Sequence, residues 1–505
     1  MDVVSQALTA LRWNAVVRLS AQGASWAITV VVMRLLTPDD YGLLAMTTVF
    51  LLMLSVLAEF GVGAAIVQAH AIDEHKLRQI FGVALLMNFG AALVVFSGSP
   101  LIARFYDEPA LVSIVRLFSI QFVMNALMVV PRGLLQRKLN FKGLALIELG
   151  ATISGGLLTL LMAFAGLGVW SLIAGNLLNL ALQVVGLNFA SPFLKLPIFS
   201  FRTVRTMVTF GASVTGTGLL WSFWSQADSL IAGRLLGREL LGAYAIGAHV
   251  VSIPLSRFSQ IVSQVAFSTF SRLQDDPAAF RTNLTRSLAL LSVGSFPLFW
   301  GLSSVAQELI AIVLGPRWST AVIPITMLAL VTPLRLLQQF TSVAARAAGR
   351  VEIEFRNTLI TALVMPASFY AGCLWGGLEG LCSVWITVYP LLLLWNLRNL
   401  FGALGLRLPA LLTAALIPGL AAAAMYLATT LLRFWVQGWL DNFPRAVLLT
   451  AAGAAVYLGL MWTFDRTGII LLWKSVRTAA GLKARPQPAA VPTGDAVRSR
   501  RDSGA

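Results

Sequence analysis

Two groups of polar side chains stand at helical spacing inside long apolar segments. One group is Arg257, Gln260 and Gln264, and the other is Arg335 and Gln338. Each group shares one helix face, and a charge at membrane depth normally faces a wet cavity or an opposite charge. Guanidinium forks suit phosphate oxygens, and amides can bind sugar hydroxyls, so the pattern predicts a site for a phosphorylated, sugar-bearing ligand. The alternative is structural: the glutamines join helices and the arginines pair with acids.

Three further ionisable residues lie in predicted spans, namely Glu59, Arg116 and Asp228. They are candidates for ion coupling or for ion pairs. Glu59 matches Arg257 in depth, so the two are a candidate cross-lobe pair, and Glu59 is equally a candidate proton or cation site. Asp228 is close enough in sequence to predict an interfacial ion pair with Arg234.

Metal and cofactor chemistry has little support in the sequence. The separation of Cys373 and Cys382 matches no metal-ligand spacing, and both are expected to be small core residues. His70 and His75 flank acidic residues in a polar segment that reads as a solvated loop. We therefore expect no metal site and no cofactor.

The elements that carry these residues belong to a membrane. The chain has 505 residues, of which 58% are hydrophobic and 11% charged, and its mean hydropathy is +0.81. One water-soluble core cannot bury that much apolar surface. The apolar runs reach about 20 residues or more, which is helix length, whereas barrel strands would be half as long and would alternate. The fold class expected is an all-α integral membrane protein.

Charged and Pro/Gly-rich breaks divide the chain into about fourteen transmembrane helices. The predicted organisation is a six-helix lobe over 1–190, a linker over 191–206, a second six-helix lobe over 207–402, two extra helices over 403–473 and a disordered basic tail over 474–505. The predicted helices lie near 14–36, 42–68, 79–100, 110–131, 143–165, 167–190, 207–232, 241–268, 285–306, 319–345, 357–376, 379–401, 408–432 and 444–464.

The two lobes begin with a similar segment. Residues 34–45, RLLTPDDYGLLA, return as residues 234–245, RLLGRELLGAYA, and each copy ends one apolar segment and opens the next. A duplicated helical bundle is typical of secondary transporters, whose substrate site lies between the repeats.

Basic residues set the orientation. They concentrate in the loops on the side of the two termini, which places both termini and the linker over 191–206 in the cytoplasm. The same bias accounts for the net charge of +16, so no nucleic-acid partner is expected. The basic tail is expected to touch membrane lipids.

Four runs carry a resemblance to a known family: RLLTPDDYG over 34–42, EFGVGAAIVQ over 59–68, QRKLNF over 136–141 and DSLIAGRLLG over 228–237. In order and spacing they resemble the polysaccharide transporter family, which includes the Wzx-type flippases of the multidrug/oligosaccharidyl-lipid/polysaccharide exporter superfamily. The resemblance implies two lobes around a central cavity, alternating access, and transfer of undecaprenyl-diphosphate-linked oligosaccharide to the outer leaflet of the bacterial inner membrane. H⁺ or Na⁺ is then a candidate coupling ion, and a polysaccharide polymerase a candidate partner.

Two other classes compete with this reading. A multidrug exporter of the same fold would favour acids rather than arginines in its cavity. A membrane polymerase or glycosyltransferase would need a large outer loop or paired catalytic acids, and the predicted outer loops are short. We therefore expect a transporter and not an enzyme.

Overall fold

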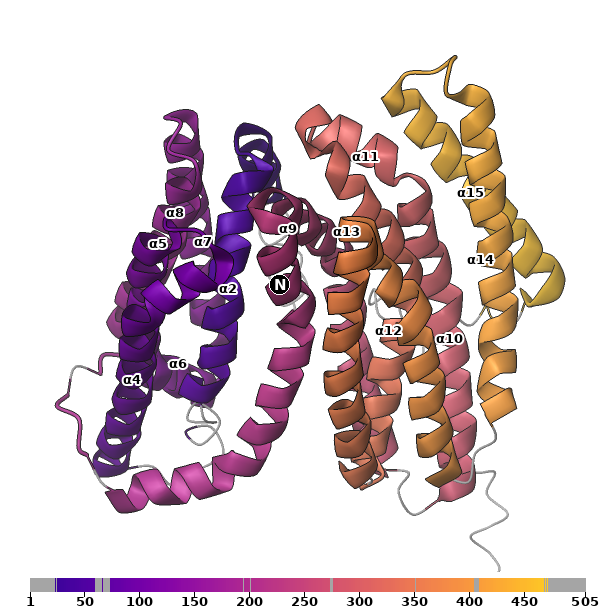
Figure 1. Cartoon of the computed structure of the whole chain (residues 1–505). Helices are drawn as coiled ribbons and strands as arrows, with labels where there is room; N and C mark the ends of the chain where they lie inside the picture. The colour runs from indigo at the N-terminus through magenta and orange to yellow at the C-terminus, as the bar shows by residue number, and fades with distance from the viewer. Residues whose placement is uncertain are drawn as a thin grey trace, which may run out of the picture.

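The computed structural model describes residues 25–59, 73–193, 195–199, 201–272, 276–349, 351–403 and 408–466, together with Gly23, Ile66, Gly468 and Ile470. Every regular element within these residues is helical (Figure 1). Eleven of the helices are long and apolar enough to cross a membrane. The all-α, multi-pass membrane fold predicted from the sequence is confirmed, whereas the count of fourteen spans stays a prediction.

The N-terminal group of helices precedes residue 191. Asp73 caps α4, because its carboxylate accepts a hydrogen bond from the Lys76 backbone N–H at 2.9 Å, and Asn140 caps α7 in the same way. The predicted fourth span is broken at Ser119 into two helices. The group consists of a helix over Ser25–Leu35, α2 (Pro38–Glu59), α4 (Glu74–Tyr106), α5 (Leu111–Phe118), α6 (Ile120–Arg137), α7 (Phe141–Phe164) and α8 (Val169–Ala190).

A long helix, α9 (Phe201–Arg272), joins this group to the C-terminal group. It consists of two helices that meet at Gly237, whose φ of +80° is a conformation that favours glycine. The predicted helix start at 207 is six residues late, because Phe201–Thr206 contains charges but no proline or glycine that would end a helix. The C-terminal group consists of α10 (Pro277–Ser304), α11 (Ala306–Val313), η1 (Pro316–Ala321), α12 (Val322–Ala347), α13 (Val351–Ala403, bent at Gly376–Gly377), α14 (Leu408–Val436) and α15 (Asn442–Phe464).

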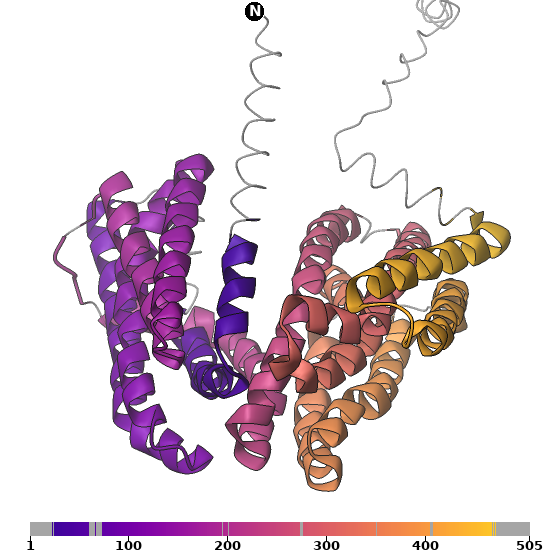
Figure 2. The ribbon, with the colours of Figure 1, turned by 90° about the horizontal axis from the view of Figure 1, so that it is seen from above.

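The two groups stand side by side in both ribbon views (Figures 1 and 2). Helix α9 connects them, since it packs against α2 on one side and against α12 and α13 on the other. Figure 1 shows the turns between α7 and α8 and between α14 and α15 at the top, which we call the upper end.

The two copies of the repeated segment pack directly against each other. A Cβ at Gly42 would overlap the backbone oxygen of Arg238, and a Cβ at Gly242 would overlap the backbone oxygen of Pro38. Because Gly42 and Pro38 correspond to Gly242 and Arg238 at an offset of 200, the contact is reciprocal. Small residues let the backbones of α2 and α9 approach this closely.

Side chains around this contact fasten the two groups. The Nε of Arg238 lies 2.7 Å from Oδ1 of Asp39, and the indole N–H of Trp318 donates to the Met33 carbonyl at 2.8 Å. The ring of Tyr41 meets the Trp318 ring edge-on, with centroids 5.5 Å apart. The N- and C-terminal groups are therefore joined through α2, α9 and η1.

A buried carboxylate holds the last two helices against the rest of the C-terminal group. Glu308 of α11 is fully buried, and its two oxygens lie 2.9 Å from Arg433 of α14 and 3.0 Å from Arg445 of α15. Each oxygen faces a different guanidinium, so one side chain fixes both helices to α11.

Candidate functional site

A cavity of about 600 Å³, which we call the Arg335 cavity, lies within the C-terminal group and α9. Three helices contribute its wall. It is lined by Trp221, Trp224, Ser252, Leu255, Ser256 and Ser259 of α9, by Arg335, Gln338, Gln339, Ser342 and Arg346 of α12, and by Glu354, Thr358, Thr361 and Tyr389 of α13.

Arg335 is a cation of this cavity that no carboxylate contacts within the described residues. Its guanidinium carbon lies 4.7 Å from the centre of the Trp385 ring, a cation–π contact. Within the described residues it forms no hydrogen bond or ion pair. Arg346, by contrast, is paired with Glu354. A half-buried guanidinium without an acceptor is stabilised by an incoming anion, so Arg335 gives the cavity the means to bind one.

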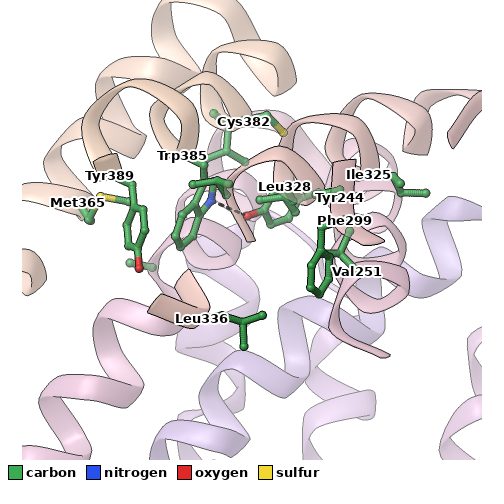
Figure 3. Packing of buried hydrophobic residues seen from close by; sticks show 14 of the residues in the cluster. Tyr244, Val251, Phe299, Ile325, Leu328, Leu336, Met365, Cys382, Trp385 and Tyr389 are labelled. Atoms are coloured by element: carbon green, nitrogen blue, oxygen red, sulfur yellow. Dashed lines mark hydrogen bonds between the residues drawn. The ribbon is translucent and has the colours of Figure 1, made fainter. Parts of the chain in front are cut away.

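The tryptophan that contacts Arg335 belongs to a chain of hydrogen bonds that ends at Asp228. The Trp385 indole N–H donates to the Tyr244 hydroxyl oxygen at 3.1 Å (Figure 3), and that hydroxyl donates to the buried Asp228 carboxylate at 2.5 Å. Asp228 and Arg335 both line a smaller cavity of about 190 Å³. The three helices α9, α12 and α13 thus place a carboxylate, a phenol and an indole around one guanidinium.

The predicted ion pair between Asp228 and Arg234 is wrong. No such pair occurs in the described part of the chain, where the Asp228 carboxylate is bonded to Tyr244 and to the Ser229 backbone. Six residues along an α-helix leave two side chains about 120° apart around its axis, so Arg234 lies on a different face of α9.

Uncharged polar groups lie beside the Arg335 cavity as well as in its wall. The Oε1 of Gln338 and both side-chain polar atoms of Asn396 are buried and have no partner among the described residues. Gln338 lines the Arg335 cavity, and both residues line an adjoining pocket of about 30 Å³, large enough for one water-sized group. Buried amides without partners favour a ligand or water that hydrogen-bonds to them.

Two tryptophans of α9, Trp221 and Trp224, line the same cavity. Trp221 is exposed, and the indole N–H of Trp224 is buried without a hydrogen-bond partner in the described part of the chain. The sequence allowed either a sugar-stacking platform or an interfacial belt, and their place in the cavity wall favours the platform.

Four predicted site residues have side chains outside the described residues. They are Glu59, Arg257, Gln260 and Gln264, for which the structure describes only the backbone, within α2 and α9. The predicted joint site of Arg257 and Arg335, and the Glu59–Arg257 pair, stay predictions.

Arg116 does not belong to the cavity. It is exposed at the end of α5, where its Nε donates to Ser99 Oγ at 3.1 Å and its guanidinium lies 5.0 Å from the centre of the Phe96 ring. Arg116 lies within the candidate membrane span Leu111–Arg137, so its position as an embedded charge stays a prediction.

Three aromatic residues around Arg335 and Asp228 were not predicted from the sequence. Trp385 and Tyr389 are spaced by four residues on one face of α13, and Tyr244 lies in the second repeat copy. That aromatic spacing was the available signal, but it is also typical of ordinary core packing. In the described residues no cluster of His, Cys, Asp or Glu could hold a metal. Cys373 and Cys382 are both buried in the apolar core.

The fold and the site define a multi-pass helical membrane protein with two groups of helices, a repeated hairpin at their contact and an arginine-containing cavity. A family model described as "Polysaccharide biosynthesis protein" matches residues 31–323, more than half of the chain. The chain belongs to this family, which confirms the resemblance found in the sequence.

Curated relatives agree with the family match. The chain is 25% identical to the lipopolysaccharide biosynthesis protein WzxC of Escherichia coli, with 75% of this chain and 77% of that protein covered. It is 26% identical to the teichuronic acid biosynthesis protein TuaB of Bacillus subtilis, covering 80% and 85%. It is 23% identical to the succinoglycan biosynthesis transport protein ExoT of Rhizobium meliloti, covering 94% and 96%.

Two solved structures share the fold. The lipid II flippase MurJ, in an inward closed conformation, aligns with a TM-score of 0.69 at 13% identity, over 90% of this chain and all of that one. An inward-facing multidrug transporter of the MATE family aligns with a TM-score of 0.57 at 13% identity, over 75% and 95%. These likenesses concern the fold alone.

Proposed function

We propose that this protein is a flippase that moves undecaprenyl-diphosphate-linked oligosaccharide across the bacterial inner membrane during the biosynthesis of a surface polysaccharide, whether exopolysaccharide, capsule or O-antigen. The observation that carries the proposal is Arg335, a cation in a cavity of about 600 Å³ whose guanidinium has no protein acceptor among the described residues. The relatives named for polysaccharide biosynthesis and transport support the substrate class.

The chemistry of the cavity suits the two ends of such a headgroup. The Arg335 guanidinium can donate two parallel hydrogen bonds to neighbouring oxygens of the diphosphate. The amide of Gln338 can bind a hydroxyl of the first sugar, and Trp221 can stack on a sugar face. The polyprenyl tail stays among the membrane lipids, since only the headgroup is costly to place in hydrocarbon.

Transport requires that the cavity open to each side in turn. The contact between the segments of Gly42 and Gly242 joins the two groups of helices, and we infer that it separates when the cavity opens to the periplasmic side. In the proposed orientation both termini are cytoplasmic and the upper end is periplasmic.

Asp228 is a candidate for coupling to H⁺ or Na⁺, because it is buried and is connected to Arg335 through Tyr244 and Trp385. A polysaccharide polymerase is the proposed downstream partner.

The competing classes explain the cavity less well. A multidrug exporter binds cationic drugs and would favour unpaired acids in its cavity. In this cavity Glu354 is paired with Arg346, whereas the Arg335 guanidinium has no ion pair or hydrogen bond among the described residues. The relatives are named for biosynthesis and transport rather than for a catalytic step, so we propose a transporter and not an enzyme.

Deletion of the gene tests this proposal. We expect loss of one surface polysaccharide and accumulation of lipid-linked repeat units in the cytoplasmic leaflet, both restored by the wild-type chain. Normal polysaccharide together with raised drug sensitivity would support the multidrug class instead.

A further inference from the structure

A second cavity, of about 520 Å³, lies in the N-terminal group. We call it the His249 cavity. It is bounded by the helix over Ser25–Leu35, by α2, α7 and α8, and by the second half of α9. No Asp, Glu, Lys or Arg is among the described residues that line it, so the polar surface that they form is uncharged apart from the His249 ring. The two cavities therefore differ in charge.

The polar lining of the His249 cavity is rich in hydrogen-bond acceptors. The hydroxyls of Thr29, Thr48 and Thr152 each donate their proton to a backbone carbonyl of their own helix, at 2.9, 3.0 and 2.8 Å. Their oxygen lone pairs are then left for an outside donor. Asn176 is exposed in the same wall, and its amide can both donate and accept. Hydroxyl groups of a sugar match this surface.

A polar face of α9 joins the two cavities. His249, Ser252, Ser256 and Ser259 follow one another at spacings of three, four and three residues, so they share one helix face. His249 lines the His249 cavity, and the three serines line the Arg335 cavity. The ten residue steps from His249 to Ser259 span about 15 Å. One extended, hydroxyl-rich ligand can follow this face from one cavity to the other.

We propose that the His249 cavity binds the uncharged sugars farthest from the diphosphate, while the Arg335 cavity holds the diphosphate. The inference rests on the proposed function and adds to it a division of the headgroup between the two helix groups. Recognition of the sugar repeat unit then belongs to the N-terminal group. Arg335 binds the diphosphate of any such lipid, whichever glycan the lipid carries.

The test compares two lipids on the full-length protein in detergent or nanodiscs. One probe is the lipid-linked repeat unit extracted from the deletion strain, and the other is undecaprenyl diphosphate carrying a single N-acetylhexosamine. We expect the combined Thr152→Val and Asn176→Leu variant to raise the Kd for the full repeat unit about tenfold, since two hydrogen bonds are lost. The Kd for the single-sugar lipid should stay unchanged. Arg335→Ala should weaken both.

Thr450→Val is the matched control. Thr450 is exposed, and its hydroxyl donates to the Ala446 carbonyl at 2.8 Å, as Thr152 does to Glu148, but it lies on α15 and lines neither cavity. His249→Leu provides a second variant should the double variant fold poorly, with the same selective loss expected.

Each outcome bears on one of the two claims. If the cavity variants weaken both lipids equally, or neither, while Arg335→Ala weakens both, the division of the headgroup is refuted and the proposed function stands. If the wild-type protein binds neither lipid, both are refuted.

Discussion

The guanidinium of Arg335 lies over the indole ring of Trp385, with its central carbon 4.7 Å from the ring centre. This cation–π contact uses none of the guanidinium N–H groups as hydrogen-bond donors, so within the described residues they are left for an acceptor. Trp385 is itself held by its hydrogen bond to Tyr244. The guanidinium is thus oriented before a ligand arrives, which lowers the entropy lost on binding.

The first prediction concerns this cation. Arg335→Ala should reduce transport of lipid-linked oligosaccharide by about tenfold or more, since a charge-assisted hydrogen bond contributes about 1.5–3 kcal/mol. Arg335→Lys should recover only part of the activity, because an ammonium lacks the fork. Surface polysaccharide and membrane protein level are measured together, with Arg116→Ala as the control from outside the cavity. Normal export by a well-expressed Arg335→Ala variant would rule out the anion site.

The second prediction concerns the repeat contact. Gly42→Ala and Gly242→Ala should each lower the melting temperature in detergent, because the added methyl group overlaps the facing backbone. Gly90→Ala is the control: Gly90 lies in α4 with open space around it, and alanine there is favoured by up to about 1 kcal/mol in helix propensity. Equal melting temperatures for all three variants would contradict the close contact.

The third prediction concerns the buried carboxylate of α11. Glu308→Ala leaves Arg433 and Arg445 without their partner and should destabilise the protein by about 3–5 kcal/mol. The expected readout is early proteolysis of the α14–α15 pair on mild heating. Glu239→Ala, an exposed acid without an ion pair in the described structure, serves as the control. Should Glu308→Ala melt like that control, the carboxylate would not be what docks the two helices.

The fourth prediction concerns orientation. A reporter fused after Arg202 should be active in the cytoplasm, and one fused after Asp107 in the periplasm, because basic loops stay on the cytoplasmic side. The opposite location of either reporter would overturn the proposed topology.

Helix positions could be predicted from the sequence where residues that end helices, such as glycine, separate one apolar segment from the next. The predicted spans near 143–165 and 167–190 match α7 (Phe141–Phe164) and α8 (Val169–Ala190), because Gly166 and Gly168 separate them. The break at Ser119 carries no glycine or proline and was not predicted. The short helix α11 was missed too, since eight residues produce no transmembrane signal.

Some residues of the candidate site could likewise be predicted from the sequence and others could not. Arg335 and Gln338 could be predicted because a charge and an amide at helical spacing are rare in an apolar segment. Asp228, Tyr244 and Trp385 meet only through the packing of α9 on α13, which no local pattern encodes. The serines that follow His249 on α9 were overlooked because small hydroxyl residues are common in membrane helices and usually bond to their own backbone.

The most direct test of the central claim is leaflet transfer by the purified protein. Liposomes containing lipid-linked repeat units in both leaflets, with and without the protein, would be exposed to an impermeant glycosidase that cleaves the accessible oligosaccharide. Wild-type protein should make the inner-leaflet pool accessible over time, and Arg335→Ala protein should do so far more slowly. If the inner-leaflet pool stays protected with wild-type protein, under every imposed H⁺ or Na⁺ gradient, the chain is not a flippase for this lipid.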